Sequence, residues 1–234
     1  MSCRHRPKRA RRAALAPELA RSQNYSIISD MKSVHAPNSL PKVILRHAQA
    51  LPEGGVLTPK EFLHLGNRAA VDQAFSRLAR TGKLLRIGRG LYTPPVHTKF
   101  GERAPAADRI VRILAQTTGE RIASHGASAA NTLGLTKQVP VREVYLTSGR
   151  TQQLRLGKAK VLLKKAPSWM LALEERPAGA AVRALAWLGP SQAAAALRRL
   201  HHTLPPEEWQ VLAAARGVLP GWLAKAIGAE AAHG

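Results

Sequence analysis

The stretch that decides the fold is residues 58–95, TPKEFLHLGNRAAVDQAFSRLARTGKLLRIGRGLYTPP. At its start Thr58 is a candidate N-cap, Pro59 stands at the first helical position, and Glu61 follows three residues after the cap. This order is typical of the capping box, in which the cap hydroxyl and the glutamate carboxylate each accept a bond from the other's backbone N–H. The pattern predicts a short helix from Pro59 to about Leu65.

A second helix is predicted from Arg68 to Thr81. Asn67 is placed to cap its start, and Gly82 supplies the left-handed exit that many helices use. Apolar residues recur along one side of it, namely Val71, Ala74, Phe75 and Leu78. A helix, a tight turn at Gly66 and a second helix are typical of the helix-turn-helix motif.

Two flanking segments complete the motif. Upstream, the apolar spacing over Ser39–Ala50 predicts an amphipathic helix. Downstream, residues 83–87 and 91–93 are predicted to form two short strands joined by a tight turn at Gly88-Arg89-Gly90. These helices and a hairpin tipped by a cation predict a winged helix-turn-helix DNA-binding domain over residues 37–95.

A helix that reads DNA needs an apolar side to seat it, a polar side for the base edges, and cations near the phosphates. Arg68, Gln73 and Arg77 are the candidates for base readout, because Arg pairs with guanine and Gln with adenine. Thr58 and Lys60 are expected near a phosphate at the start of their helix. The hairpin cations Lys83, Arg86 and Arg89 are expected along the DNA backbone or in the minor groove. The predicted DNA-contacting residues are Thr58, Lys60, Asn67, Arg68, Ala69, Gln73, Ser76, Arg77, Arg80, Lys83, Arg86 and Arg89.

A second, mixed region is predicted over residues 104–230, after a linker that begins at Pro94. Alternating apolar residues predict a small antiparallel sheet with strands over Ile122–Ala123, Val141–Ser148, Gln152–Leu156 and Lys160–Lys165. Helices are predicted over Pro105–Thr118, Ala127–Leu133, Gly179–Leu188, Ser191–Thr203, Pro206–Arg216 and Pro220–Ile227. The expected fold class is therefore α+β, with a winged helix-turn-helix followed by a mixed domain that ends in helices.

The chain is strongly basic. Its 234 residues contain 36 Lys and Arg against 14 Asp and Glu, a formal net charge of +22. A charge of this size favours a polyanionic partner. The single cysteine, Cys3, allows no intramolecular disulfide, and no apolar run reaches the roughly 20 residues that a membrane span needs. We expect a cytoplasmic protein without membrane contact.

Residues 1–36 are predicted to form a disordered basic arm, because they lack hydrophobic periodicity and are rich in Arg and Ala. No apolar run follows the basic residues, so they are not a secretory signal. Met31 opens a more ordinary beginning, MKSVHAPNSLPKVIL, and we hypothesise that translation starts there. Mass spectrometry of the native N-terminus tests this, and an intact Met1 or Ser2 terminus contradicts it.

A second basic cluster lies in the sheet region, with no acidic residue between Glu143 and Glu174. Its members are Arg150, Arg155, Lys158, Lys160, Lys164 and Lys165. A solvated sheet face is one interpretation, and a second nucleic-acid surface is another. If this cluster is the primary surface, the chain is a basic RNA- or ribosome-associated protein that loses more from changes here than from changes on the Arg68–Thr81 helix.

Catalytic and metal-binding patterns are poorly supported. The acidic pairs Glu174-Glu175 and Glu207-Glu208 consist of neighbours that point apart. His201-His202 cannot both face one metal, and no further ligand follows at a suitable spacing. Ser124-His125 lacks an Asp partner for a triad, and Gly88-Arg89-Gly90 lacks the following Lys-Ser/Thr of a phosphate loop. We expect that the chain is not an enzyme and binds neither a cofactor nor a metal. The third interpretation is an enzyme that acts on a toxin or on a nucleotide.

Three segments together resemble a known family. They are residues 58–95, residues 124–167, SHGASAANTLGLTKQVPVREVYLTSGRTQQLRLGKAKVLLKKAP, and residues 219–223, LPGWL. Over about residues 38–227 the chain resembles the AbiEi-type antitoxins, the transcriptional-regulator half of bacterial abortive-infection toxin–antitoxin pairs of type IV. The segments NTLGLTKQVP and VYLTSGR are more specific to this resemblance than a generic winged helix.

The resemblance implies a repressor that binds double-stranded DNA at inverted repeats in its own promoter, with the DNA-reading helix at Asn67–Arg80 and the wing at Lys83–Tyr92. It also implies a C-terminal antitoxin domain, in which the second basic cluster falls where such antitoxins carry basic residues. A neighbouring nucleotidyltransferase-like toxin is implied as the functional partner, neutralised without a stable complex. The implied location is the bacterial cytoplasm, in association with the nucleoid.

Overall fold

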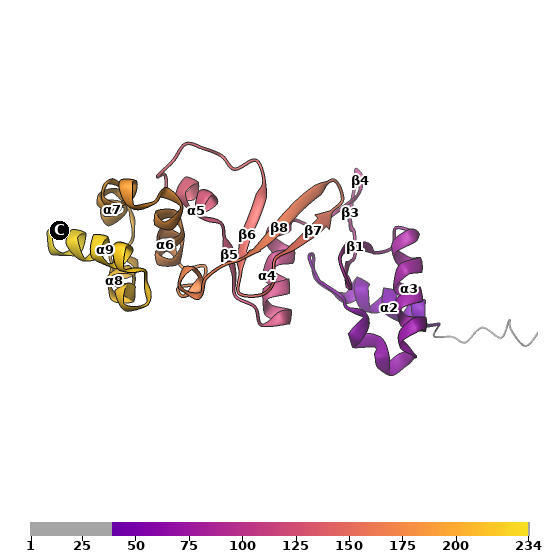
Figure 1. The fold of residues 1–234 in the computed structure, drawn as a ribbon. Coiled ribbons are helices and arrows are strands. Elements are labelled where there is room, and N and C mark those ends of the chain that lie inside the picture. Colours follow the sequence, from indigo (N-terminus) through magenta and orange to yellow (C-terminus); the bar gives the residue numbers. More distant parts are fainter. Residues whose placement is uncertain (1–38, 234) are drawn as a thin grey trace, which may run out of the picture. The chain divides into compact units, whose positions relative to one another are not determined.

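The computed structural model describes residues 39–233, which form a mixed α+β fold (Figure 1). The predicted basic arm, residues 1–36, and the proposed start at Met31 lie outside the described residues. From Leu40 onward the chain forms one compact unit. Along this unit, helices are followed by two hairpins, a mixed sheet and a C-terminal group of helices.

The helices α2 (Leu40–Ala50), η1 (Pro59–Leu65) and α3 (Arg68–Arg80) lie at the predicted positions, and η1 is a 3-10 helix. The side-chain oxygen of Asn67 accepts a bond from the N–H of Ala70 at 2.8 Å, which confirms the predicted cap of α3. The predicted apolar side of α3 is buried along its whole length. Caps and apolar spacing are local signals, and here they decide the local structure.

Ring contacts join these helices to the hairpin that follows. His47, Phe62, Phe75 and Tyr92 form a series in which successive ring centroids lie 5.4, 5.5 and 4.8 Å apart. Aliphatic side chains of α2 and α3, together with Leu57 and Leu84, complete this core. Because α3 contributes to the core from one side only, its opposite side faces solvent.

The strands β1 (Leu85–Gly88) and β2 (Leu91–Thr93) form the predicted antiparallel hairpin. Gly90 adopts a φ of +70° in the turn between them. Leu57 pairs with Tyr92 through two backbone hydrogen bonds of 2.7 and 3.0 Å. These two bonds fix the start of η1 against the hairpin.

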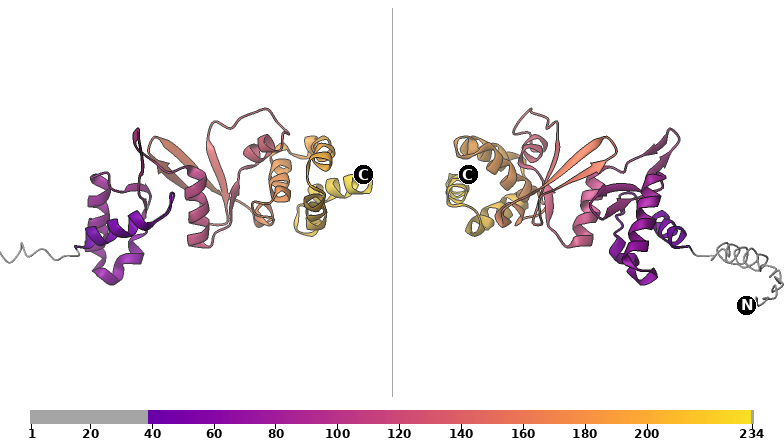
Figure 2. Two further views of the ribbon diagram at one scale, coloured as in Figure 1. Left: turned by 180° about the vertical axis from the view of Figure 1, so that it is seen from behind. Right: turned by 45° about the vertical axis from the view of Figure 1, so that its right-hand side comes forward.

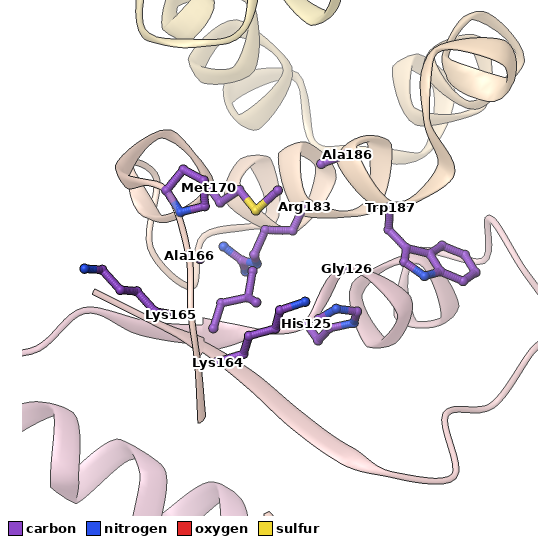
Figure 3. Close-up of a pocket in the computed structure, with 11 residues that line it drawn as sticks. His125, Gly126, Lys164, Lys165, Ala166, Met170, Arg183, Ala186 and Trp187 are labelled. Carbon is purple, nitrogen blue, oxygen red and sulfur yellow. The ribbon is translucent and has the colours of Figure 1, made fainter. Parts of the chain in front are cut away.

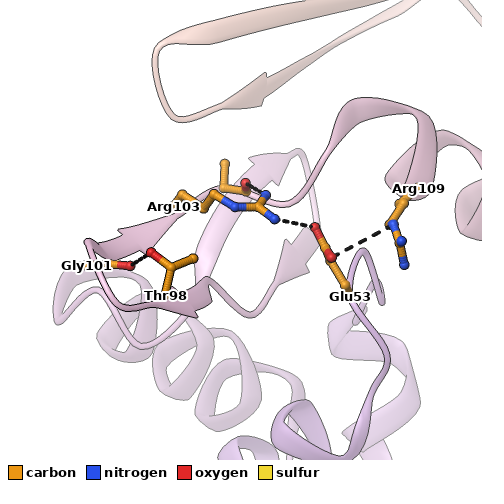
Figure 4. A network of polar contacts seen from close by, with 6 residues as sticks. Glu53, Thr98, Gly101, Arg103 and Arg109 are labelled. Carbon is orange, nitrogen blue, oxygen red and sulfur yellow. Dashed lines mark hydrogen bonds and ion pairs between the residues drawn. The ribbon is translucent and has the colours of Figure 1, made fainter.

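The residues predicted as a linker, 94–104, contain a second hairpin made of β3 (Val96–Thr98) and β4 (Gly101–Arg103). The Thr98 hydroxyl donates to the Gly101 carbonyl at 2.8 Å and closes the turn (Figure 4). The prediction of a linker is wrong for these residues. Consecutive prolines mark a break in regular structure, but they carry no information about the pairing of the strands that follow.

Glu53, in the turn after α2, ties that turn to β4 and to helix α4 (Ala107–Thr118) (Figure 4). Its carboxylate accepts a bond from Arg103 at 3.0 Å and lies 3.8 Å from the guanidinium of Arg109. The adjacent Gly54 has a φ of +86°, and a Cβ added to it would lie 2.9 Å from the Cβ of Arg109. Both the backbone conformation and the close approach to α4 therefore require glycine.

Alanine at Gly54 is expected to destabilise the fold by about 2–5 kcal/mol, because a left-handed backbone and an overpacked contact add together. The matched control is alanine at Gly82, which has a φ of +74° but no atom within 4 Å of an added Cβ. The control should cost only the conformational part, about 1–2 kcal/mol. Urea unfolding measures both variants, and equal losses would show that the contact with α4 is unimportant.

A four-stranded sheet follows, with the order β5 (Ile122–Ser124), β6 (Glu143–Thr147), β8 (Ala159–Lys165), β7 (Gln152–Leu156). The β5–β6 and β7–β8 pairs are antiparallel, as predicted. The β6–β8 pair is parallel, so the prediction of a wholly antiparallel sheet is wrong. Consecutive strands are usually neighbours, but here β7 lies at the edge of the sheet and β8 lies between β6 and β7.

Helix α4 covers one face of this sheet (Figure 2). Its apolar side packs on Leu154, Val161 and Leu163 of the strands β7 and β8. Val56 and Ile87, from the segment before the sheet, are buried in the same cluster. The β1–β2 hairpin therefore shares a hydrophobic core with the sheet.

The remaining helices pack around an Ala- and Leu-rich core. They are α5 (Gly126–Thr132), η2 (Ser168–Leu171), α6 (Pro177–Leu188), α7 (Pro190–Thr203), α8 (Pro206–Ala214), η3 (Ala215–Val218) and α9 (Gly221–His233). At one end of the sheet, Leu171 covers Ala123 and Leu146 on the face opposite α4. None of the helices within residues 39–233 is long and apolar enough to cross a membrane.

The start of α6 is held by Glu208 of α8, whose carboxylate accepts bonds from Arg176 at 2.7 Å and from the N–H of Ala178 at 2.9 Å. The hydrogen bond from Arg176 is the main cause that lowers the pKa of Glu208 below its ordinary value. Because the folded-state pKa is depressed, the carboxylate stabilises the fold at neutral pH, and this contribution is lost as the pH falls through the folded-state pKa.

Glu208→Gln is therefore expected to lower the Tm at pH 7. The difference in Tm between the variant and the wild type should shrink as the solution is acidified below the ordinary carboxyl range. Thermal unfolding over a series of pH values measures this. Glu207→Gln, at the exposed neighbouring position, is the control and should change little. A deficit of Glu208→Gln that persists undiminished in acid would show that the charge is not the stabilising factor.

Candidate nucleic-acid interface

The predicted DNA-reading side of α3 is exposed to solvent. Ala69, Gln73, Ser76, Arg77 and Arg80 all lie on this side. Within residues 39–233, no side-chain hydrogen bond or ion pair ties these residues to a neighbour. The side chains are thus available to an external partner.

The amino end of α3 is partly committed to internal contacts. Asn67 uses its side-chain oxygen for the cap, which leaves only its NH2 group for other partners. Arg68 donates to Asp72 at 2.8 Å, and the two side chains are 61% and 47% exposed. An exposed pair of this kind contributes at most about 1 kcal/mol, so a phosphate or a guanine can replace Asp72 at small cost.

The start of η1 differs from the predicted phosphate site. The Glu61 carboxylate accepts bonds from both the backbone N–H and the hydroxyl of Thr58, at 3.1 and 2.8 Å. The predicted capping box is present, because the Thr58 side chain also accepts from the Glu61 N–H. This N–H lies 3.2 Å from the Thr58 carbonyl as well. The Glu61 carboxylate repels a phosphate at this point. Of Thr58 and Lys60, the two residues predicted to lie near a phosphate, only Lys60 offers an exposed positive charge.

A groove of about 600 Å³ lies between α3, the start of η1 and the β1–β2 hairpin. We call it the α3–hairpin groove. The cations that line it are Lys60, Arg68, Arg86, Arg89 and Arg150, and among the described residues Asp72 is the only carboxylate in the lining. Arg150 comes from the loop between β6 and β7, far from the others in sequence. A concave surface with such an excess of positive charge concentrates the electric field and attracts polyanions.

Arg155 of β7 extends this positive surface. Together with Gln153 it lines a smaller hollow of about 310 Å³, whose other side carries Arg86 and Arg89 of the hairpin. Arg155 also stands directly opposite Lys160 in the β7–β8 pair. Like charges that face each other across a strand pair destabilise a sheet, and no carboxylate among residues 39–233 forms an ion pair with either. A bound polyanion would relieve the repulsion.

The second basic cluster is not a single surface. Its members divide into Arg150 with Arg155, Lys158 with Lys160, and Lys164 with Lys165. The first pair faces the hairpin, the second lines a hollow near the β7–β8 turn, and the third lies at the far end of β8 beside α5 and α6. Lys160 and Lys164 are separated because four residues of an extended strand span about 13 Å, whereas Arg155 and Lys160 are neighbours across the β7–β8 pair but line different hollows.

The residues considered for catalysis make structural contacts. The Nδ1 atom of His125 accepts a bond from the N–H of Ala127 at 3.2 Å and so caps α5. Glu175 accepts a bond from the N–H of Ser124 at 2.9 Å, and His201 stacks on Trp209 with centroids 4.3 Å apart. In the described part of the chain, no group of three or more His, Cys, Asp or Glu side chains is arranged to hold a metal ion.

Arg183 of α6 is a residue that the sequence analysis did not single out. It is buried beside His125 and Lys164 and lines the pocket at the end of β8. A signal was present, because a single Arg stands within the apolar helix PAGAAVRALAWL, and Arg is almost never fully buried without a partner. Gln153, which lines two of the hollows, carries no comparable signal, since exposed Gln is common on strands.

Comparison with known proteins gives a family without an assigned activity. Residues 43–208 match DUF6088, a family of unknown function. This match covers more than half of the chain, and the chain belongs to this family. No curated protein and no solved structure matches the chain.

Proposed function

We propose that this chain is a sequence-specific DNA-binding transcriptional repressor, with a winged helix-turn-helix over residues 40–93. In this proposal α3 is the recognition helix and the β1–β2 hairpin is the wing. The observation that carries the proposal is the α3–hairpin groove, in which cations from α3, the hairpin and the β6–β7 loop face one concave surface. Duplex DNA is the polyanion whose groove accepts a helix while its phosphates meet the flanking cations.

The exposed side of α3 supports base readout rather than a purely electrostatic contact. Gln73 and Arg77 can each form two hydrogen bonds to a purine edge in the major groove, and Ala69 can contact a thymine methyl group. The cations of the groove and of the hairpin would contact phosphates, which position the helix but carry no sequence information. The arrangement thus separates residues that select a sequence from residues that supply affinity.

The proposal is tested by gel shift on the DNA upstream of the chain's own gene, against a scrambled duplex of the same composition, at two salt concentrations. We expect the upstream DNA to bind at least about 10³-fold more tightly than the scrambled duplex, and both affinities to fall steeply with salt. Equal binding of the two duplexes would refute sequence-specific repression.

Gln73→Ala is expected to reduce the preference for the upstream DNA over the scrambled duplex by about 10-fold, because one bidentate base contact contributes about 1–3 kcal/mol of discrimination. Its affinity for the scrambled duplex should not change, since phosphates make that contact. Gln192→Ala, at an exposed position of α7, is the matched control. An unchanged preference in Gln73→Ala would remove α3 from base readout.

The resemblance to AbiEi-type antitoxins supports a further part of the proposal. The repressor would act as the antitoxin of an abortive-infection operon, on its own promoter in the bacterial cytoplasm, and would oppose a nucleotidyltransferase-like toxin without forming a stable complex. Co-expression with a toxin encoded by the neighbouring gene tests this part. Growth restored by the wild-type chain supports the antitoxin role, whereas growth arrest that persists contradicts it.

A second candidate function is RNA or ribosome binding through the sheet. Lys158 and Lys160 favour it, because they line a hollow that contains no residue of the α3–hairpin groove. Lys158→Ala with Lys160→Ala separates the two functions. Loss of RNA binding with unchanged DNA binding would support the second candidate, and unchanged RNA binding would contradict it.

A further inference from the structure

A pocket of about 320 Å³ lies between the end of β8, the start of α5 and helix α6 (Figure 3). This is within the size range of small-molecule sites, about 300–1,000 Å³. Arg183 from α6, Lys164 from β8 and His125 from the start of α5 converge on it (Figure 3), and Lys165 also lines it. The pocket contains none of the residues that line the α3–hairpin groove.

Arg183 is the unusual residue of this pocket, with only 1% of its surface exposed. One terminal nitrogen donates to the Glu174 carbonyl at 2.6 Å, and the other lies 3.5 Å from the Ser124 hydroxyl. Its Nε atom is buried without a hydrogen-bond partner. No carboxylate of residues 39–233 lies within ion-pair distance of the guanidinium.

Burial lowers the pKa of Arg183, but a guanidinium remains protonated in proteins. A buried charge with an unsatisfied donor is costly to the folded state. Within the described residues, the two terminal nitrogens of this buried cation have partners, but its Nε donor has none. An anion in the adjoining pocket is the partner that would satisfy it.

The surroundings add a second cation and a neutral donor. Lys164 lines the pocket and forms no ion pair within the described residues. Burial, and secondarily the charge of Lys164, lower the pKa of His125, so this imidazole is neutral at pH 7. Because its Nδ1 accepts from Ala127, its proton is on Nε2, which can donate to a ligand.

The remaining wall of the pocket is apolar. Trp187, with 39% of its surface exposed, lines one side, and Leu146 and Met170 line another. Gly126 allows α5 to lie directly against α6, since a Cβ there would be only 2.4 Å from the carbonyl oxygen of Arg183. The cations and the indole are thereby brought to the same cavity.

We propose that this pocket binds a phosphorylated small molecule that carries a planar aromatic group. The phosphate would be held by Arg183 and Lys164, with the planar group against Trp187. Two cations match the double charge of a phosphate monoester better than the single charge of a carboxylate. The few polar groups placed in a largely apolar lining are typical of a site for an organic ligand rather than for an inorganic ion.

Isothermal titration calorimetry of the full chain with adenosine 5′-monophosphate, inorganic phosphate and adenosine tests the proposal. We expect the nucleotide to bind at least about 10-fold more tightly than inorganic phosphate, and adenosine not to bind, because both halves of the ligand contribute. Equal affinities for the nucleotide and inorganic phosphate, or no binding of either, would overturn the proposal.

Lys164→Gln is expected to weaken nucleotide binding by about 10-fold or more, whereas the matched Lys158→Gln, in a different hollow, should leave it unchanged. Arg183→Met should abolish binding while the Tm of the free protein holds or rises, since it removes at similar volume a buried charge that has no ion-pair partner within residues 39–233. Arg89→Ala should not change nucleotide affinity, which separates this site from the proposed DNA surface. Wild-type affinity in Lys164→Gln refutes the proposal even if Arg183→Met fails to fold.

Discussion

A variant with alanine at Arg86, Arg89 and Arg150 is expected to bind duplex DNA on the order of 100-fold to 1,000-fold more weakly than the wild type at about 0.1 M salt. Each phosphate contact contributes about 0.9 to the slope of log affinity against log salt, so the slope should fall by about 2.7. Specificity should be nearly unchanged, because phosphate contacts do not read sequence. Fluorescence anisotropy over a salt series measures affinity and slope together.

The control for this variant removes the same amount of charge elsewhere. Lys137, Arg198 and Lys225 are exposed and line none of the hollows described above. Alanine at all three should reduce affinity only slightly. If it weakens binding as much as the groove variant does, the attraction is a property of net charge, and the α3–hairpin groove is not the DNA surface.

Arg150 gives this experiment its diagnostic value. In the sequence it belongs to the second basic cluster, and in the structure it lines the same groove as Arg68, Arg86 and Arg89. Restoring Arg150 alone in the triple variant should recover about one third of the lost slope. No recovery would limit the DNA surface to the proposed winged helix-turn-helix.

Phe75→Ala is expected to destabilise the fold by about 3–5 kcal/mol, the usual cost of removing a buried Phe side chain. Phe75 is 0% exposed, and its ring lies 5.5 Å from that of Phe62 and 4.8 Å from that of Tyr92. The cavity would separate α3 from both η1 and β2. A loss of this size is a large part of the roughly 5–15 kcal/mol that keeps a domain folded.

Urea unfolding measures this loss, with Phe100→Ala as the matched control. Phe100 lies in the β3–β4 turn and is 89% exposed, so its removal should change stability by no more than about 0.5 kcal/mol. DNA binding at a temperature near the Tm of Phe75→Ala should fall with the folded fraction. Similar losses in the two variants would show that the aromatic series does not hold α3 in place.

Much of the local structure could be predicted from local signals. Asn67 and the spacing of Val71, Ala74, Phe75 and Leu78 predict α3 and its buried side, and the structure has both. Strand β7 lies where alternation places it. These features depend on residues within a few positions of one another, where backbone geometry alone decides which side chains share a face.

Side-chain hydrogen bonds were less predictable, even over short distances. The spacing of Thr58 and Glu61 predicts the capping box that the structure has, but the additional bond from the Thr58 hydroxyl to the Glu61 carboxylate was not predicted. A hydroxyl can donate or accept with similar energy, so the residue types do not determine the direction of the bond.

The residue types and their local order specify the helices, the first hairpin, the positive charge and the exposed polar side of α3. Tertiary structure decides which distant residues share a site. Arg150 lines the α3–hairpin groove, whereas Lys164 lines the pocket at the far end of β8 together with Arg183 and His125. The cause is the strand order, with β8 inserted between β6 and β7. The strand order depends on the free energy of the whole core, which no single segment of the sequence determines. The neighbours of each cation therefore follow from packing rather than from its position in the sequence.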